Sequence, residues 1–177
     1  MAGKVLVAAA ARGAEGTGRA AYVAVIGPGD GATAAECAEA EQAGRLLAGR
    51  GAVLICGGLG GVMEAAAKGA RAGGGTAVGL LPGRDRRAAN PFLSVALATG
   101  LGELRNGLVA GVSDAVIAVG GSWGTFSEIA LAMRAGKPVA VIGGWAVRLP
   151  AGASGREPPA ARSAEEAITV IFATLTP

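Results

Sequence analysis

Four apolar runs that each end in a glycine-rich turn constrain the fold of this chain more than any other feature. The runs are continuous stretches of apolar residues, which are typical of strands buried on both faces of a parallel sheet. The carboxyl ends of parallel strands lie along one edge, where α/β proteins bind their ligands. The runs with their turns are Tyr22–Gly27 with Pro28-Gly29, Ala52–Cys56 with Gly57-Gly58, Thr76–Leu81 with Pro82-Gly83, and Ala115–Val119 with Gly120-Gly121.

Helical segments separate these runs. Thr33 and Glu36 form a capping box, which predicts a helix start, and Ser163 with Glu166 predicts a last helix that ends at about Leu175. Periodicity and composition predict further helices over 61–72 and 106–112 and from Phe126, and further strands over 93–98 and 138–142.

Strands that alternate with helices predict an α/β protein with a Rossmann-like open parallel sheet and helices on both faces. The length of 177 residues fits a single domain with a real hydrophobic core. We expect this domain to span residues 22–177. Residues 1–21, with a short alanine-rich run and a polar stretch, are predicted to be a flexible N-terminal extension.

Composition and charge exclude several classes of function. The net charge is only +3 and aromatic residues make up 3%, so binding of nucleic acid is disfavoured. No uncharged run is long enough to span a membrane. The chain lacks histidine and has two cysteines, Cys37 and Cys56, which argues against Ser-His or Cys-His catalysis and against a metal site. Two cysteines without a disulfide framework suit a reducing cytoplasm, where we expect the protein to reside.

The first glycine turn resembles a dinucleotide-binding fingerprint in spacing alone. Gly27, Gly29 and Ala32 fit its pattern, but such a site also needs an acidic residue about 20 residues later to hold the ribose hydroxyl. The second strand ends instead at Cys56, followed by Gly57. The sequence therefore argues against NAD, and this turn is interpreted as structural or as a contact to a mononucleotide.

The segment from Val119 to Glu128 joins a strand end, a glycine-rich turn and a helix start. Backbone N–H groups at such a junction can hold a phosphate, which we expect over residues 121–125. Glu128 has two interpretations. Thr125 and Glu128 fit a capping box, in which the carboxylate only satisfies helix amides, but the carboxylate could also act on a ligand beside the glycines. Trp123 could stack on that ligand or contact a partner subunit.

Three segments, taken in the order in which they occur, resemble the LONELY GUY superfamily. This superfamily is also called lysine-decarboxylase-like or SLOG. The segments are residues 57–64, 102–106 and 121–128, and the match covers residues 22–144. Within the superfamily, the chain resembles most a bacterial branch related to molybdenum-cofactor carrier proteins. It resembles DprA-type DNA-processing proteins more distantly. The best-known members of the superfamily are cytokinin riboside 5'-monophosphate phosphoribohydrolases. A lysine decarboxylase is not expected, because no lysine has a recognisable pyridoxal-phosphate setting.

The resemblance implies roles for particular residues. Arg105 matches the family's catalytic arginine and Glu128 its glutamate, and the family's phosphate-binding Gly-Thr matches Gly124 and Thr125. With the glycine-rich strand ends, the predicted ligand-binding residues are Gly27, Gly29, Gly57, Gly58, Gly61, Gly121, Ser122, Gly124 and Thr125.

The chain departs from the family's pattern at four positions, and at one of them the histidine often found just before the arginine is absent. Gly120 replaces a proline, Ser122 replaces a glycine, and Asn106 stands where the hydrolases usually have lysine. Phosphate binding tolerates these changes more easily than catalysis does. Two hypotheses therefore stay open beside a weaker third, a DNA-processing accessory.

The first hypothesis is hydrolysis of the N-glycosidic bond of nucleoside 5'-monophosphates to a free base and ribose 5-phosphate. Glu128 would stabilise positive charge on the ribose and activate a water, and Arg105 would bind the phosphate or orient the substrate. The alternative is a non-catalytic carrier of a phosphorylated pterin such as molybdenum cofactor. Neither requires a resident cofactor, and the resemblance implies a homodimer or higher homo-oligomer.

Overall fold

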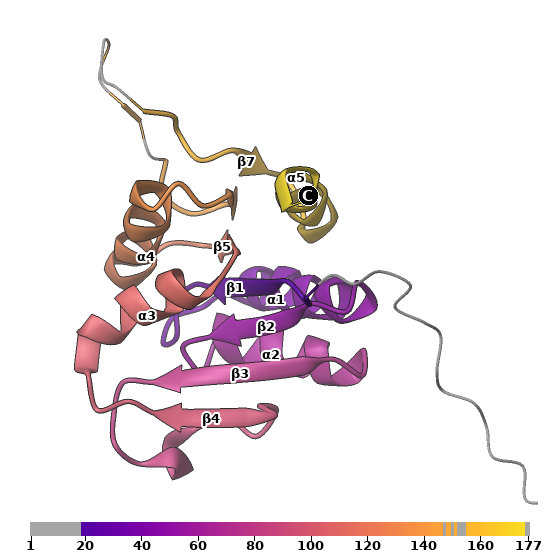
Figure 1. Cartoon of the computed structure of the whole chain (residues 1–177), viewed down its shortest axis with the longest axis vertical. Coiled ribbons are helices and arrows are strands. Elements are labelled where there is room, and N and C mark those ends of the chain that lie inside the picture. The colour runs from indigo at the N-terminus through magenta and orange to yellow at the C-terminus, as the bar shows by residue number, and fades with distance from the viewer. Residues whose placement is uncertain (1–18, 147, 150, 152–154, 176–177) are drawn as a thin grey trace, which may run out of the picture.

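A single sheet of seven parallel strands forms the centre of the computed structural model, which describes residues 19–146, 148–149, 151 and 155–175. The strand order is β4-β3-β2-β1-β5-β6-β7 (Figure 1). Parallel neighbours need connections that return across the sheet, which the helices provide for most pairs. The strands are β1 (Tyr22–Ile26), β2 (Val53–Cys56), β3 (Thr76–Leu81), β4 (Val95–Ala98), β5 (Ala115–Val119), β6 (Val139–Ile142) and β7 (Ala160–Ala161).

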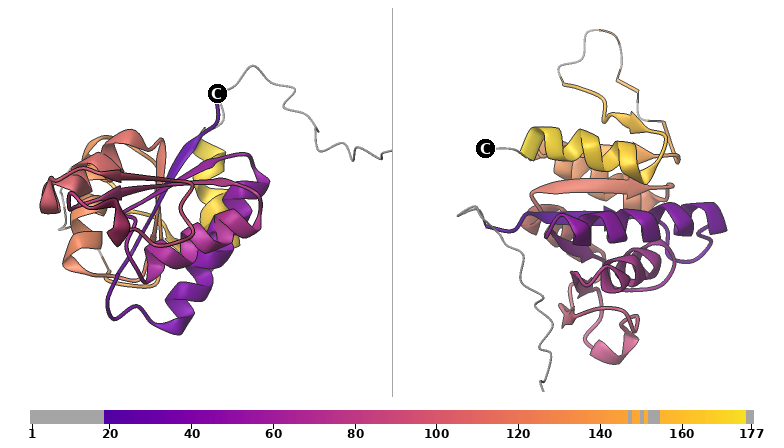
Figure 2. Two further views of the ribbon diagram at one scale, coloured as in Figure 1. Left: turned by 90° about the horizontal axis from the view of Figure 1, so that it is seen from below. Right: turned by 90° about the vertical axis from the view of Figure 1, so that its right-hand side faces the viewer.

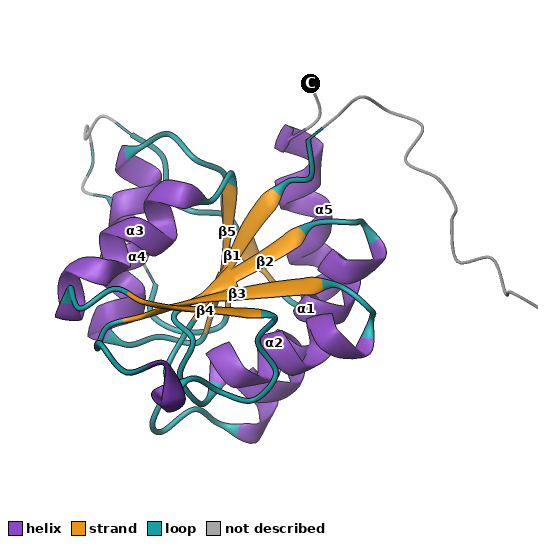
Figure 3. Ribbon diagram, turned by 60° about the horizontal axis from the view of Figure 1, so that its bottom comes forward, coloured by secondary structure: helices purple, strands orange, loops and turns teal. Residues whose placement is uncertain are grey.

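Helices cover both faces of the sheet (Figure 3). Helices α1, α2 and α5 pack on one face and α3 and α4 on the other, each over its own buried cluster. Successive strand residues point to opposite faces, so Val23 belongs to the first cluster and Ala24 to the second. The helices are α1 (Ala34–Gly49), α2 (Val62–Ala72), α3 (Arg105–Val112), α4 (Trp123–Arg134) and α5 (Ala164–Leu175), with 3₁₀ turns η1 (Arg86–Ala88) and η2 (Gly102–Leu104).

The helices on the first face pack closely because small residues lie between them. An added Cβ at Gly44 of α1 would collide with the backbone of α2, and one at Gly69 of α2 would collide with the backbone of α1. Helix α5 lies beside α1 (Figure 2), where the Ala164 amide donates to Glu39 Oε2 at 2.7 Å. The many glycines and alanines thus serve close helix packing as well as turns.

The strand order places a crevice in the middle of the sheet. From the central pair β1 and β5, strands β2, β3 and β4 continue to one side and β6 and β7 to the other. The loops after β1 and β5 therefore leave in opposite directions, and such a reversal is where open α/β sheets bind ligands. Two of the predicted glycine-rich turns, after Ile26 and after Val119, meet at this crevice.

The predicted Rossmann-like α/β fold is confirmed, with three local differences. Helix α4 begins at Trp123 and not at Phe126, because Ser122 caps it. The segment after β3 contains the η1 turn, and the segment before α5 contains the short strand β7, neither of which is among the predicted elements. Most of the predicted N-terminal extension, residues 1–18, lies outside the described residues. In the described part of the chain, no helix combines the length and apolar character needed to cross a membrane.

Candidate functional site

A cavity of about 80 Å³ opens at the central crevice, beyond the ends of β1 and β5. It brings together residues that are far apart in the sequence: the β1 and β2 turns, the start of α3 and the start of α4. The lining residues are Ile26, Gly27, Gly57, Met63, Glu103, Arg105, Asn106, Ser122, Gly124, Thr125 and Glu128. Both predicted catalytic residues and five of the nine predicted ligand-binding residues therefore lie in one place, while Gly29, Gly58, Gly61 and Gly121 lie outside the lining.

The N-terminus of α4 forms one wall of this cavity. Ser122 caps the helix through its Oγ, which accepts a hydrogen bond from the Thr125 amide at 3.1 Å. The amides of Trp123 and Gly124, the first two helical residues, have no acceptor within the described part of the chain. Free amides at the positive end of a helix dipole favour an anion. Ser122, which replaces a family glycine, thus leaves the two outermost amides available.

Gly124 leaves room at this wall. An added Cβ there would have only ordinary contacts, 3.7 Å to Ser122 Oγ and 3.8 Å to Asn106 Nδ2. The position is helical, where alanine is more favourable than glycine by about 1 kcal/mol. A methyl group at Gly124 would therefore fill part of the cavity without straining the fold.

Glu128 lies inside the cavity and does not cap α4. It is the sixth residue of the helix, and the cap is Ser122, so the capping-box interpretation of Thr125 and Glu128 is wrong. The side chain is buried, with 6% of the residue exposed. Burial raises the pKa of the Glu128 carboxyl to about 7, an effect that Arg105 opposes and Glu103 reinforces. At neutral pH this carboxyl is therefore divided between its protonated and ionised forms.

Arg105 begins α3 and faces Glu128 across the cavity. Its Nη1 lies 3.7 Å from Glu128 Oε1, beyond hydrogen-bond distance, so the ion pair is loose. The residue is 8% exposed, and its buried Nε has no hydrogen-bond partner among the described residues. A buried, unsatisfied guanidinium N–H is costly, and a ligand oxygen could satisfy it. Gly57 leaves room for it, because an added Cβ there would displace the guanidinium of Arg105 and the sulfur of Met63.

Asn106 joins the two helices that carry these residues. Its Nδ2 donates to Ser127 Oγ at 3.0 Å, and Ser127 Oγ donates to the Gly124 carbonyl oxygen at 2.7 Å. The side chain that replaces the family's lysine is therefore a neutral tie between α3 and α4 and adds no positive charge to the cavity. Three further residues line the site that were not predicted as ligand contacts: Asn106, Met63 and Glu103. In the sequence, only their closeness to Arg105 or to the Gly57-Gly58 turn pointed to the site.

Lys137 fixes the other end of α3. Its ammonium group donates to the carbonyl oxygens of Ala110, Gly111 and Ser113, which end the helix. A cation at a helix C-terminus satisfies free carbonyls and opposes the dipole. With Asn106 at one end and Lys137 at the other, α3 is held against its neighbours, and the position of Arg105 is held with it.

The predicted glycines outside the lining support the loops. Gly61 starts α2 at a φ of +63° and packs against the backbone of Gly29, and Gly58 has a φ of +80°. Gly120 has a φ of +69° and packs against the Glu36 carboxylate. Proline fixes φ near −65°, so the family's proline does not fit the backbone that this chain adopts at Gly120.

The described residues contain no group of three or more His, Cys, Asp or Glu side chains placed to hold a metal ion. Fold and site together define a Rossmann-like α/β protein with a candidate anion site at the centre of its sheet. A model of the SLOG cluster4 family matches residues 20–170, and the chain belongs to this family. The predicted membership of the SLOG superfamily is thereby confirmed.

Known proteins with similar sequences or structures agree with this assignment. An uncharacterised protein of Archaeoglobus fulgidus is 48% identical over 125 residues, 68% of this chain and 78% of the relative. The molybdenum cofactor binding protein of Rippkaea orientalis is 36% identical, with a TM-score of 0.82 over 89% of this chain and 99% of that one. The molybdenum cofactor carrier protein of Chlamydomonas reinhardtii is 33% identical, with a TM-score of 0.79 and coverages of 89% and 99%.

A more distant likeness concerns the fold alone. DNA processing protein A of Streptococcus pneumoniae is 18% identical, with a TM-score of 0.66 over 86% of this chain and 62% of that one. The expected DprA-like relationship is therefore present at the level of the fold.

Proposed function

We propose that this protein binds and carries a phosphorylated pterin of the molybdenum-cofactor type. One observation carries the proposal: the free amide of Gly124 at the start of α4 and the buried guanidinium of Arg105, whose Nε lacks an acceptor among the described residues, border the same cavity. Phosphate oxygens are suited to both groups, since charge-assisted and bidentate hydrogen bonds are strong. The names of the solved relatives from Rippkaea and Chlamydomonas support this ligand class.

The size of the cavity suits a carrier. A volume of about 80 Å³ is far below the several hundred Å³ of sites that enclose whole ligands, so this cavity takes the anionic group and the ring lies beyond it. A ligand that no single cavity encloses can be handed on to an acceptor protein. The two free thiols, Cys37 and Cys56, are consistent with our placement of the protein in the cytoplasm.

Glu128 supports a second candidate function, hydrolysis of the N-glycosidic bond of a nucleoside 5'-monophosphate. A carrier needs no carboxylate in its phosphate cavity, whereas a glycosidase uses one to stabilise positive charge on the ribose and to activate water. A carboxyl with a pKa of about 7 is suited to proton transfer at neutral pH. The loose contact with Arg105 leaves the Glu128 oxygens free for such a role.

Binding and product release can be measured on the same protein. We expect a phosphorylated pterin and ribose 5-phosphate to bind in calorimetric titrations, and the Gly124→Ala variant to lose at least tenfold in affinity while its melting temperature stays equal or rises. Its matched control is Gly49→Ala, at an exposed helical glycine of α1 with open space around it, which should leave affinity unchanged.

Absence of binding by the wild type, or equal binding by Gly124→Ala, would contradict the anion site. Release of ribose 5-phosphate from AMP or a cytokinin riboside monophosphate, lost in Glu128→Ala, would replace the carrier by the hydrolase. Binding without release supports the carrier.

We infer further that the chain forms a homo-oligomer through α3. The exposed residues of this helix are Gly107, Leu108, Gly111 and Val112, none of them polar, and Leu104 just before it is 79% exposed. A helix whose exposed side chains are all apolar normally packs against another surface. Exposed Val95 and Leu97 of the edge strand β4 add to this surface, and a second copy of the chain would cover it.

A charged residue introduced on the exposed face of α3 should therefore separate the subunits. Leu108→Glu is expected to shift the protein to a monomer in sedimentation velocity, because an isologous interface places the new carboxylate near its own copy. The control is Ala173→Glu, at an exposed position of α5 on the opposite face of the sheet. A wild-type monomer, or a Leu108→Glu variant of unchanged mass, would refute the interface.

A further inference from the structure

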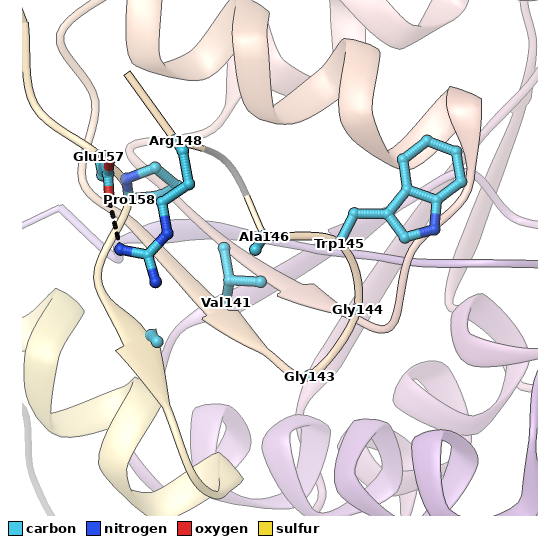
Figure 4. Close-up of a pocket in the computed structure, with 9 residues that line it drawn as sticks. Val141, Gly143, Gly144, Trp145, Ala146, Arg148, Glu157 and Pro158 are labelled. Atoms are coloured by element: carbon cyan, nitrogen blue, oxygen red, sulfur yellow. Dashed lines mark hydrogen bonds and ion pairs between the residues drawn. The ribbon is translucent and has the colours of Figure 1, made fainter. Parts of the chain in front are cut away.

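A second and larger cavity lies on the other side of the glycine turn that follows β5. Its volume is about 360 Å³, within the range of sites that enclose small organic ligands. It lies between the end of β6 and β7, and its apolar floor includes Val141 and Ala160. Figure 4 shows Trp145 at one end and the Arg148–Glu157 pair at the other, with Val141 between them.

The loop that lines this cavity packs directly on the turn of the anion site. An added Cβ at Gly144 would collide with the Gly120 carbonyl, and one at Gly121 would lie 3.0 Å from the Trp145 amide nitrogen. The indole of Trp145 also contacts that of Trp123, with ring centroids 4.8 Å apart, and Trp123 is the first residue of α4. The two cavities are therefore neighbours, separated by one turn of backbone.

Glu157 gives the larger cavity a specific polar group. Its Oε1 accepts from the Leu149 amide at 2.9 Å, and its Oε2 accepts from Arg148 Nη1 at 3.4 Å. An ionised carboxylate has about four acceptor sites, so about two remain unused. A carboxylate with both oxygens accessible can accept two parallel N–H donors, the pattern along the amino-pyrimidinone edge of a guanine or pterin ring.

We propose that this cavity binds the ring of the same ligand, an inference that rests on the proposed function. The anionic group lies on α4 and Arg105, and a planar fused heterocycle lies between Val141 and Trp145 with its N–H edge on Glu157. The division of volume fits this arrangement: the cavity of about 80 Å³ excludes a fused ring, and the cavity of about 360 Å³ admits one. The subsite selects rings with an N–H donor edge over adenine, which presents a ring-nitrogen acceptor there.

Three probe ligands separate the affinity due to the anionic group from the affinity due to the ring. Ribose 5-phosphate tests the anion site alone, and GMP and AMP add rings with and without the donor edge. We expect GMP to bind about tenfold more tightly than AMP, because two hydrogen bonds to a charged group are at stake. Glu157→Gln, which keeps an acceptor for the Leu149 amide, should reduce GMP affinity to that of AMP and leave ribose 5-phosphate unchanged.

Fluorescence locates the ring directly. The chain has two tryptophans, Trp123 and Trp145, so Trp123→Phe leaves Trp145 as the single reporter beside the cavity. GMP should change its emission and ribose 5-phosphate should not. A second variant, Ala146→Phe, fills the cavity from an exposed position and should also abolish the preference for GMP.

The outcomes distinguish this subsite from the anion site. Equal affinities for GMP and AMP, or a preference that survives Glu157→Gln, overturn the ring subsite while binding of ribose 5-phosphate upholds the anion site. Failure of all three probes to bind overturns both.

Discussion

The Glu128→Gln variant is expected to be more stable than the wild type by about 3 kcal/mol above pH 8, and equally stable near pH 4. Burial raises the pKa of the Glu128 carboxyl from 4.5 in the unfolded chain to about 7 in the folded protein. The folded protein thus holds this proton more tightly, and the wild type loses stability as the pH rises from about 4.5 through 7. A neutral glutamine of similar shape has no such loss.

Chemical denaturation of both proteins across this pH range measures the difference in their free energies of unfolding. The titration of all other groups cancels in this difference. The matched control is Glu165→Gln on α5, where hydrogen bonds lower the pKa of an exposed carboxyl. This control should therefore bring no gain at high pH. A constant difference between Glu128→Gln and the wild type at all pH values would contradict a titrating, buried Glu128.

The Arg105→Met variant is expected to bind ribose 5-phosphate about a hundredfold more weakly, a loss of about 2.7 kcal/mol. Methionine preserves much of the buried apolar stem but removes every guanidinium donor. Arg105→Lys should recover only part of the affinity, because an ammonium lacks the planar fork that binds two phosphate oxygens. The control is Arg134→Met at the exposed end of α4, which removes the same charge far from the cavity.

Calorimetric titration of the four proteins with ribose 5-phosphate gives the affinities. Long-range attraction by net charge would predict similar losses for both methionine variants. Equal affinities of Arg105→Met and the wild type would show that the buried guanidinium holds no ligand.

The strands were predictable because their signal is local. Tyr22–Ile26 and Ala115–Val119 are short apolar runs that end in glycine-rich turns, a pattern typical of strands covered on both faces. The capping box of Thr33 and Glu36 is complete in the structure, with both of its hydrogen bonds formed. These signals depend on a few neighbouring residues, so sequence reasoning places them well.

The start of α4 was less predictable because two caps compete in the sequence. Ser122 and Thr125 are hydroxyl residues three positions apart, and each could directly precede a helix. The pattern of Thr125 with Glu128 also fits a capping box. The structure uses Ser122, since this choice lets Thr125 and Glu128 turn inward and become buried. Burial is a property of the packed protein and leaves no mark on a capping pattern.

The sequence by itself determined the parallel α/β sheet and the glycine-rich turns on one edge, because alternation of apolar runs with turns is a local property. Only the tertiary structure decided that Arg105 and Glu128 face each other at 3.7 Å, and that the Nε of Arg105 has no partner among the described residues. It also decided that a larger cavity with Glu157 lies near them. Distance, burial and the raised pKa of Glu128 all depend on which strands become neighbours. That pairing joins segments many residues apart, and no local pattern specifies it.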